Sequence, residues 1–195
     1  MLRRVIATSA CLASILVVAA CGAGDQAPSP TPGAPTTENS AAPPPPASQV
    51  ENPKDMGAVA EDPCSGLTPD NLAAVGAGTE PPVIEESEWG QGICVWDDSN
   101  ASVSVTPDTV NGGGFGRIQS NKDLFTNYTE LDIGGHPAAK VDASDVTCGV
   151  IVGVNDHDTL MIDGAVYSDE AKMQDACAIA EKAAASALSN LPPKS

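Results

Sequence analysis

The residues best suited to covalent chemistry in this 195-residue chain are its cysteines. Four of them, Cys64, Cys94, Cys148 and Cys177, lie far apart along the chain. A four-thiolate zinc site needs close pairs such as Cys-x-x-Cys, so this spacing disfavours a metal site. Outside the cytosol such thiols form disulfides, and four cysteines allow three pairings. Bridging from strand to strand and from terminus to terminus is the simplest geometry, and it predicts Cys94–Cys148 and Cys64–Cys177.

A further cysteine, Cys21, closes an apolar run at the start of the chain. Arg3 and Arg4 form a basic region, an apolar core extends to Val18, and two alanines precede Cys21. This pattern predicts a secretory signal peptide over residues 1–20, because a transmembrane helix needs about 20 apolar residues and this run is shorter. The apolar-small-small-Cys ending resembles the bacterial lipobox, in which the cysteine is acylated, as by palmitate, and becomes the mature N-terminus. Cleavage without lipidation is the alternative.

The strong negative charge of the chain limits its partners. The formal net charge is −17, and the loss of the two positive charges of Arg3 and Arg4 would change it to −19. Such a surface repels nucleic acid and anionic lipid headgroups. We therefore expect no nucleic-acid partner, and attachment to the extracytoplasmic face of the cell membrane through acyl chains alone.

Groups for catalysis are sparse outside the cysteines. His136 follows two glycines and His157 lies in an Asn-Asp-His-Asp run, and both contexts are typical of turns. No Gly-x-Ser-x-Gly motif occurs, and the glycine-rich residues 111–116, which we interpret as a flexible loop, lack the Lys-Ser/Thr of a P-loop.

Carboxylates are plentiful, but a paired acid and base must face each other across a cleft. We expect no enzyme, metal or cofactor; an envelope hydrolase with carboxylate or histidine chemistry is the alternative.

One aromatic side chain stands out as a candidate for binding. Aromatic residues make up only 3% of the chain, and Trp89 lies in an acidic, glycine-rich stretch, Glu-Trp-Gly-Gln-Gly, ahead of an expected strand. A large ring in such a loop either faces solvent, where it can bind a partner, or folds back over the core. Trp89 is therefore the candidate binding residue.

The elements that would position these groups divide the chain into a tether and one domain. Residues 21–60 are rich in proline and small residues and hold no aromatic residue, which is typical of a disordered, extended linker. We expect residues 61–195 to form the folded domain.

Apolar periodicity within this domain predicts both strands and helices. Alternation about a polar turn predicts a hairpin over 92–97 and 101–106, and capping and spacing signals mark the helices, including Ser168 as the cap of the last one. Further strands are expected at 130–133, 137–141, 148–154 and 159–166, and helices at 68–76, 118–128 and 169–189. The fold class is α+β: an antiparallel sheet with helices packed mostly on one face.

The order of five short motifs resembles that of a known family. They are Asp62-Pro63-Cys64 ahead of Leu67-Thr68-Pro69, then Cys94-Val95-Trp96, then Gly134-Gly135-His136-Pro137-Ala138, then Cys148-Gly149-Val150, and finally Asp175-Ala176-Cys177. Over about residues 61–192 the chain resembles the DUF3558 family, actinobacterial lipoproteins of uncharacterised function. The resemblance implies an envelope lipoprotein and no particular activity.

The layout and the resemblance together shape what we expect of fold and function. The layout is also similar to the Mog1/PsbP-like α-β-α sandwich. The expected function is a non-catalytic module that binds a protein or small ligand of the cell envelope. A carrier that holds an apolar ligand between helices and sheet is a further alternative.

Overall fold

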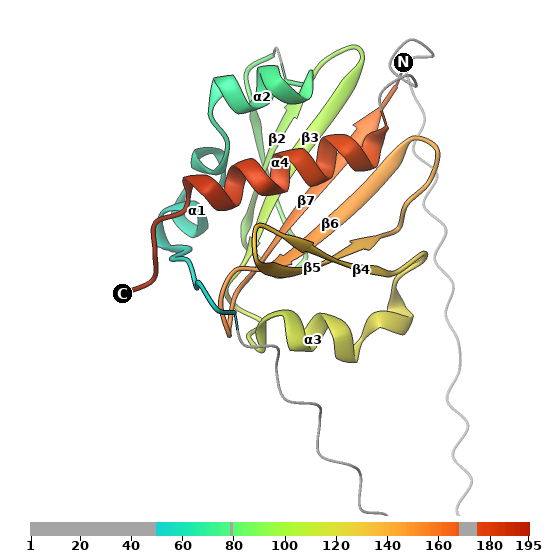
Figure 1. Cartoon of the computed structure of the whole chain (residues 1–195). Coiled ribbons are helices and arrows are strands. Elements are labelled where there is room, and N and C mark those ends of the chain that lie inside the picture. Colours follow the sequence, from blue (N-terminus) through green and yellow to red (C-terminus); the bar gives the residue numbers. More distant parts are fainter. Residues whose placement is uncertain (1–49, 79, 168–174) are drawn as a thin grey trace, which may run out of the picture. The chain divides into compact units, whose positions relative to one another are not determined.

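The computed structural model describes residues 50–78, 80–167 and 175–195, and these form one antiparallel sheet with helices on both faces (Figure 1). The α+β class expected from the sequence is therefore confirmed. The predicted signal peptide, Cys21 and most of the predicted tether lie outside the described residues, as does Ser168, the expected cap of the last helix. No helix in the described part of the chain is long and apolar enough to cross a membrane.

Two antiparallel meanders make up the sheet. Strands β1–β3 form the first and β4–β7 the second, and they join where β3 pairs with β7, so that the order is β1-β2-β3-β7-β6-β5-β4. The register of this central pair runs from Ala101↔Val166 to Asp108↔Thr159. The strands are β1 (Val83–Glu86), β2 (Gly92–Asp97), β3 (Ala101–Asp108), β4 (Thr129–Ile133), β5 (His136–Val141), β6 (Thr147–Gly153) and β7 (Thr159–Val166).

Helices cover the two faces of the sheet unequally. The covered face, as we call it, lies under α1 (Gly57–Glu61), the 3-10 turn η1 (Pro63–Gly66), α2 (Pro69–Val75) and the long α4 (Ala176–Asn190). Among the described elements, the other side, which we call the open face, carries α3 (Gly114–Ser120) and the 3-10 turn η2 (Lys122–Leu124), near β5 and β6 (Figure 1).

Alternating apolar side chains of the central strands fill the space beneath α4. Val103 and Val105 of β3 and Leu160 and Ile162 of β7 are fully buried there. The inward side of α4 is built mainly from alanines, with Ile179 and Leu188, and the alanines let the helix approach the sheet closely. This approach requires glycine at position 164, because a Cβ there would lie 2.6 Å from the carbonyl oxygen of Ala176.

Several local predictions are confirmed by the hydrogen bonds. Thr68 and Asn71 form a reciprocal capping box at the start of α2, and Gly76 ends that helix in the left-handed conformation with φ 70°. The predicted hairpin corresponds to β2 and β3, and the strands on both sides of Gly134 and Gly135 correspond to β4 and β5.

The folded domain begins earlier than residue 61. Val50, Met56 and Val59 are buried, and the backbone N–H of Lys54 donates to the carbonyl oxygen of Val154 over 3.0 Å. Lys54 also forms an isolated bridge with Pro193. The expected boundary was too late because these few apolar residues follow a proline-rich stretch and looked like part of the linker.

Two helix predictions need correction, and one strand was not predicted. The helix expected over 118–128 instead begins at Gly114 and ends at Ser120, followed by η2, so the glycine-rich segment is partly helical. The last helix begins at Ala176 among the described residues, with the Asp175 side chain accepting from the N–H of Cys177 over 2.9 Å. Strand β1 was not predicted at all, since it is short and follows two prolines.

The predicted disulfide pairing is wrong. The bridges join Cys64 to Cys94 and Cys148 to Cys177, with Cα–Cα distances of 5.1 Å and 5.0 Å. Cys94 lies on β2 and Cys148 on β6, and both β3 and β7 run between them. At about 4.8 Å per strand this places the two residues roughly 14 Å apart, beyond the reach of a disulfide.

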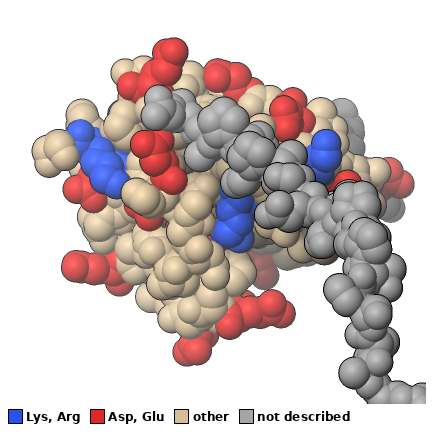
Figure 2. Space-filling model, turned by 90° about the horizontal axis from the view of Figure 1, so that it is seen from below, with Lys and Arg blue, Asp and Glu red and all other residues tan. Residues whose placement is uncertain are grey.

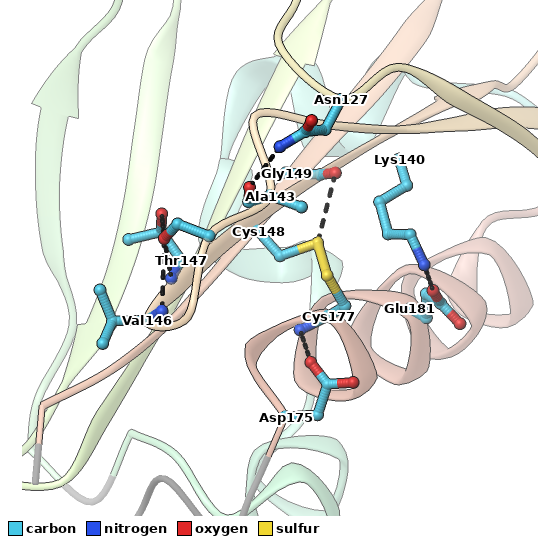
Figure 3. The surroundings of a disulfide bond; sticks show 11 residues. Asn127, Lys140, Ala143, Val146, Thr147, Cys148, Gly149, Asp175, Cys177 and Glu181 are labelled. Carbon is cyan, nitrogen blue, oxygen red and sulfur yellow. Dashed lines mark hydrogen bonds and ion pairs between the residues drawn. A yellow bond between two sulfur atoms is a disulfide. The ribbon is translucent and has the colours of Figure 1, made fainter.

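Each bridge instead fastens a helical segment to the strand beneath it. Cys64 connects η1 to β2, and Cys177 connects the first turn of α4 to β6. Figure 3 shows the second bridge, with Lys140 of β5 reaching Glu181 of α4 further along the helix, over 3.3 Å. The covered face is therefore cross-linked at two places.

Candidate binding cleft

The open face of the sheet is only partly covered. Phe115 and Ile118 of α3 pack on Ala139, Val141 and Ile151, which all lie towards one side of the sheet. Among the described helices, α3 packs mainly on β6 over this face, and its apolar cluster extends to Met161 of β7. Figure 2 views the molecule from below, the side on which α3 lies in Figure 1, and shows acidic side chains around the margin of the view and few basic ones.

Glycines position α3 against the turn between β6 and β7. Gly113 precedes the helix in the left-handed conformation, and the N–H of Gly114 donates to the carbonyl oxygen of His157 over 3.1 Å. A Cβ at Gly114 would lie 2.7 Å from the carbonyl oxygen of Asp156, so a larger residue does not fit there. The glycine-rich segment thus allows a close contact between backbones, and it places Arg117 and Ile118 over the sheet.

Trp89 lies on a tightly hydrogen-bonded turn between β1 and β2. The N–H of Ser87 donates to the carbonyl oxygen of Gln91 over 2.8 Å. The side chain of Gln91 exchanges two hydrogen bonds with Thr109, at 2.8 and 2.9 Å, which fasten the turn to the end of β3. The indole N–H of Trp89 donates to the carbonyl oxygen of Pro107 over 3.4 Å, and the residue is 36% exposed. The ring is therefore held in place while part of it faces solvent.

A cleft of about 360 Å³ opens beside this ring, and we call it the Trp89 cleft. Its floor is formed by strands β6 and β7, and α3 with the residue after η2 forms one wall. Its apolar lining consists of Ile118, Phe125, Ile151 and Met161, and its polar lining of Asp108, Asn111, Arg117 and Thr159. A preformed pocket with a mostly apolar lining and a few converging polar groups is the usual form of a small-ligand site.

The polar part of the cleft is an ion pair with a supporting amide. The guanidinium of Arg117 forms a salt bridge with the buried carboxylate of Asp108, and its Nε–H donates to the carbonyl oxygen of Gly112 over 3.1 Å. Asn111 donates to Asp108 from both its backbone N–H and its side chain, each at 3.0 Å. The Arg117 side chain is 34% exposed, and a guanidinium has five N–H donors. Arg117 therefore retains donors for a hydrogen-bond acceptor on a ligand.

A second hollow on the open face, of about 270 Å³, surrounds Asp163 on β7. The Ser104 hydroxyl donates to the Asp163 carboxylate over 3.2 Å. Burial raises the pKa of Asp163 above its ordinary value and the nearby Asp142 carboxylate raises it further, while the Ser104 hydrogen bond opposes this shift. Asp163 follows Met161 on the same face of β7, so this hollow lies along the strand from the Trp89 cleft.

The two histidines lie outside the Trp89 cleft. His136 is buried at the start of β5, with its Nδ1 at 2.9 Å from the carbonyl oxygen of Gly153. His157 is exposed on the turn between β6 and β7, where Asn155 Oδ1 accepts from the backbone N–H groups of His157 and Asp158. This confirms the interpretation of the Asn-Asp-His-Asp run as a turn. In the part of the chain that the structure describes, no three His, Cys, Asp or Glu side chains gather so as to hold a metal ion.

The motif order proposed from the sequence is matched by a family model. The model described as "Protein of unknown function (DUF3558)" matches residues 16–190. The chain belongs to the DUF3558 family. No curated protein and no solved structure matches this chain. The Mog1/PsbP-like relationship therefore stays a prediction for the DUF3558 domain.

Of the residues singled out from the sequence, the structure places Trp89 at the cleft and separates it from both histidines. Asp108, Arg117 and Phe125 were not predicted as site residues from the sequence, because they come from three segments that meet only in the fold. Arg117 carried one usable signal, since it is one of few basic residues in this DUF3558 chain and it follows the glycine-rich segment.

Proposed function

We propose that this DUF3558 protein is a lipoprotein, anchored through acylated Cys21 to the extracytoplasmic face of the cell membrane, whose folded domain is a non-catalytic binding module of the envelope. The basic, apolar and small-small-Cys pattern at the start of the chain supports the anchor. The two disulfides are compatible with an oxidising compartment. The family match begins at residue 16 and thus includes Cys21. An actinobacterial source belongs to the same proposal.

The observation that carries the binding role is the aromatic ring held beside a preformed cleft. Trp89 is fixed by its indole hydrogen bond and by the bonded turn around it, so little side-chain freedom is lost when a ligand packs on the ring. The apolar floor suits an apolar group, and Arg117 suits a hydrogen-bond acceptor. The ligand class that fits is a small molecule or a protein side-chain cluster of the envelope with both features.

The two alternative functions gain less support. A carrier that holds its ligand between α4 and the sheet needs space there, but Ala180, Ala183 and Ala184 are fully buried against Val150 and Leu160 in one packed cluster.

A hydrolase would need a histidine beside carboxylates in a cleft. His157 lies on an exposed turn, and His136 is buried against a backbone carbonyl.

Metabolic labelling tests the anchor. Cells that express the full chain are grown with an alkyne analogue of palmitate, and the protein is recovered and assayed for the label. We expect labelling of the wild-type chain and loss of labelling in Cys21→Ser, while Cys11→Ser, which changes a cysteine within the apolar run, keeps it. An unlabelled wild-type protein would contradict the anchor.

A retention experiment tests the cleft. The chain without residues 1–20, made soluble by Cys21→Ser, is immobilised and exposed to a detergent extract of the envelope of the source organism. We expect one or more components to be retained by the wild type and lost in Trp89→Ala. Tyr167→Ala removes another exposed aromatic ring, which lies outside the cleft, and should keep them. Equal retention by the two variants would contradict a role for the cleft.

A further inference from the structure

The edge strand β1 presents both backbone and apolar side chains to solvent. It pairs with β2 alone, so within the described residues its outer edge has no neighbouring strand. Val83 and Ile84 project to opposite faces and are 57% and 63% exposed. A row of unpaired N–H and C=O groups at a sheet edge is a template on which an extended chain can add as another strand.

The surroundings of β1 are acidic. Glu85 and Glu86 follow the two apolar residues on the strand, and both are exposed. On the open face, a hollow of about 380 Å³ lies between β1 and the end of β2, and its lining includes Glu80, Asp97 and Asp98 but no lysine or arginine. This hollow lies at the opposite end of the β1–β2 pair from the Trp89 turn, so it is a separate surface.

We propose that β1 is a docking strand for an extended polypeptide segment in which two consecutive basic residues adjoin two consecutive apolar residues. Each face of β1 carries one apolar and one acidic side chain, Val83 with Glu85 and Ile84 with Glu86. An antiparallel partner that reads Lys-Lys-apolar-apolar places a basic side chain opposite each glutamate and an apolar one opposite each apolar residue. Such cross-strand pairs are the unit that stabilises a sheet.

A second copy of this chain does not fit the same edge. In a symmetric antiparallel pairing, Val83 would face the Glu86 of the other copy and Ile84 its Glu85, so that every apolar residue meets a carboxylate. A parallel pairing would place glutamates opposite glutamates, which is unfavourable. Each copy also carries a formal charge of −17, and like charges repel.

The features that protect this edge also select its partner. Pro81 and Pro82 lack backbone N–H groups, and they precede the strand, so neither residue can donate to an added strand. Short length, proline and charge are the means by which natural sheets prevent unspecific pairing at an edge. At β1 the charges are all negative, and they therefore disfavour acidic strands and favour basic ones.

A peptide titration tests this proposal independently of Cys21 and of the Trp89 cleft. The probe is fluorescein-labelled Lys-Lys-Val-Ile-Thr-Thr-Lys, whose last lysine would lie near the hollow, and binding to the soluble chain with Cys21→Ser is followed by fluorescence anisotropy. We expect saturable binding that weakens as salt is raised from 50 to 500 mM, roughly as screening predicts. Glu-Glu-Val-Ile-Thr-Thr-Glu should not bind.

Charge reversal provides the sharper comparison. We expect Glu85→Lys with Glu86→Lys to weaken binding of the basic peptide by about tenfold or more and to gain binding of the acidic one. The matched control, Glu51→Lys with Glu61→Lys, makes the same change in net charge at exposed positions elsewhere and should retain the wild-type preference.

The backbone amide resonances show where the peptide binds. We expect the largest shifts at residues 83–86 and in the facing strand 92–97, and circular dichroism confirms that both double variants are folded. The proposal is overturned if the wild type does not bind the basic peptide, if the control pair changes the preference as strongly as the β1 pair, or if the shifts lie on another part of the sheet.

Discussion

The covered and open faces of this sheet are built from the same seven described strands, yet they differ in almost every physical respect. Under α4 the strands present valine, leucine and isoleucine, the helix presents alanine, and two disulfides connect helical segments to strands. On the other side the same strands present Ser104, Asp163 and Met161 around two hollows. The covered face is packed and cross-linked, while the open face combines a smaller packed cluster under α3 with two preformed hollows.

This difference indicates that stability and binding occupy opposite faces. An alternating strand places every second residue on each face, so β3 and β7 can be optimised for packing on one side without constraint on the other. The cross-links fasten η1 and α4 to the strands of the covered face. The following variants test this division, from the largest expected effect to the smallest.

Loss of a disulfide should disturb the covered face most. Each bridge closes a loop of about 30 residues, and the chain-entropy model gives roughly 3–4 kcal/mol for such a loop. Cys148→Ala with Cys177→Ala should therefore lower the melting temperature by about 7–14 °C. Scanning calorimetry measures this loss.

The other bridge provides the comparison. Cys64→Ala with Cys94→Ala opens a loop of nearly equal length, so the two pairs should lose similar stability if the effect arises in the unfolded chain. A small loss for either pair would show that the helices hold the covered face without that bridge.

Added methyl groups should distinguish one position on each face, Gly164 and Gly149. In Gly164→Ala the new Cβ meets backbone of α4, 2.6 Å from the Ala176 carbonyl oxygen, so the helix must move and about 1–3 kcal/mol is lost. In Gly149→Ala, on the open face, the Cβ meets mainly side chains, Val141 at 3.0 Å and Asp163 at 3.1 Å, which can adjust. Urea unfolding should show a clearly smaller loss for Gly149→Ala. Equal losses would mean that the open face is as tightly packed as the covered one.

The half-buried carboxylate of Asp163 on the open face should make stability depend on pH. Burial raises the pKa of Asp163 in the folded state, so the folded chain binds a proton that the unfolded chain has released. The contribution of Asp163 to stability is therefore lost as the pH rises from the ordinary aspartate pKa through the raised pKa of the folded state. Asp163→Asn should melt a few degrees higher than wild type at pH 7 and lose this advantage at pH 3.

The control for this experiment is an exposed aspartate. Asp123→Asn changes the same group on η2, away from the Asp163 hollow, and should leave the difference between pH 3 and pH 7 as in the wild type. If Asp163→Asn behaves like Asp123→Asn, the carboxylate of Asp163 is not the cause of the pH dependence.

Local signals in the sequence were sufficient for most elements but not for their arrangement. Alternation about a polar turn identifies β2 and β3, and Gly134 and Gly135 mark the turn between β4 and β5. A continuous apolar run identifies β6, and the polar turn after it marks the start of β7. The contact of β3 with β7 joins residues about 60 positions apart, and no local pattern encodes it. The disulfide prediction failed for this reason, since the separation of Cys94 from Cys148 depends on that contact.

The candidate site shows the same limit. Trp89 could be selected because a large ring among glycines has a local signature. Its neighbours Arg117 and Phe125 reach the cleft only because α3 packs on the turn at Asp156. From the sequence, the glycines that permit this packing were interpreted as a flexible loop. Cys21 lies outside the described residues, so its acylation stays a prediction.

Amide hydrogen exchange tests the division between the two faces most directly. Exchange is measured on the soluble, disulfide-intact chain, before and after saturation with the envelope component that the Trp89 cleft retains. We expect α4 to exchange slowly in both states, and new protection to appear in residues 87–91, in the end of β3 and in α3. New protection confined to α1, α2 or α4 would contradict the account, because it would place binding on the face assigned to stability.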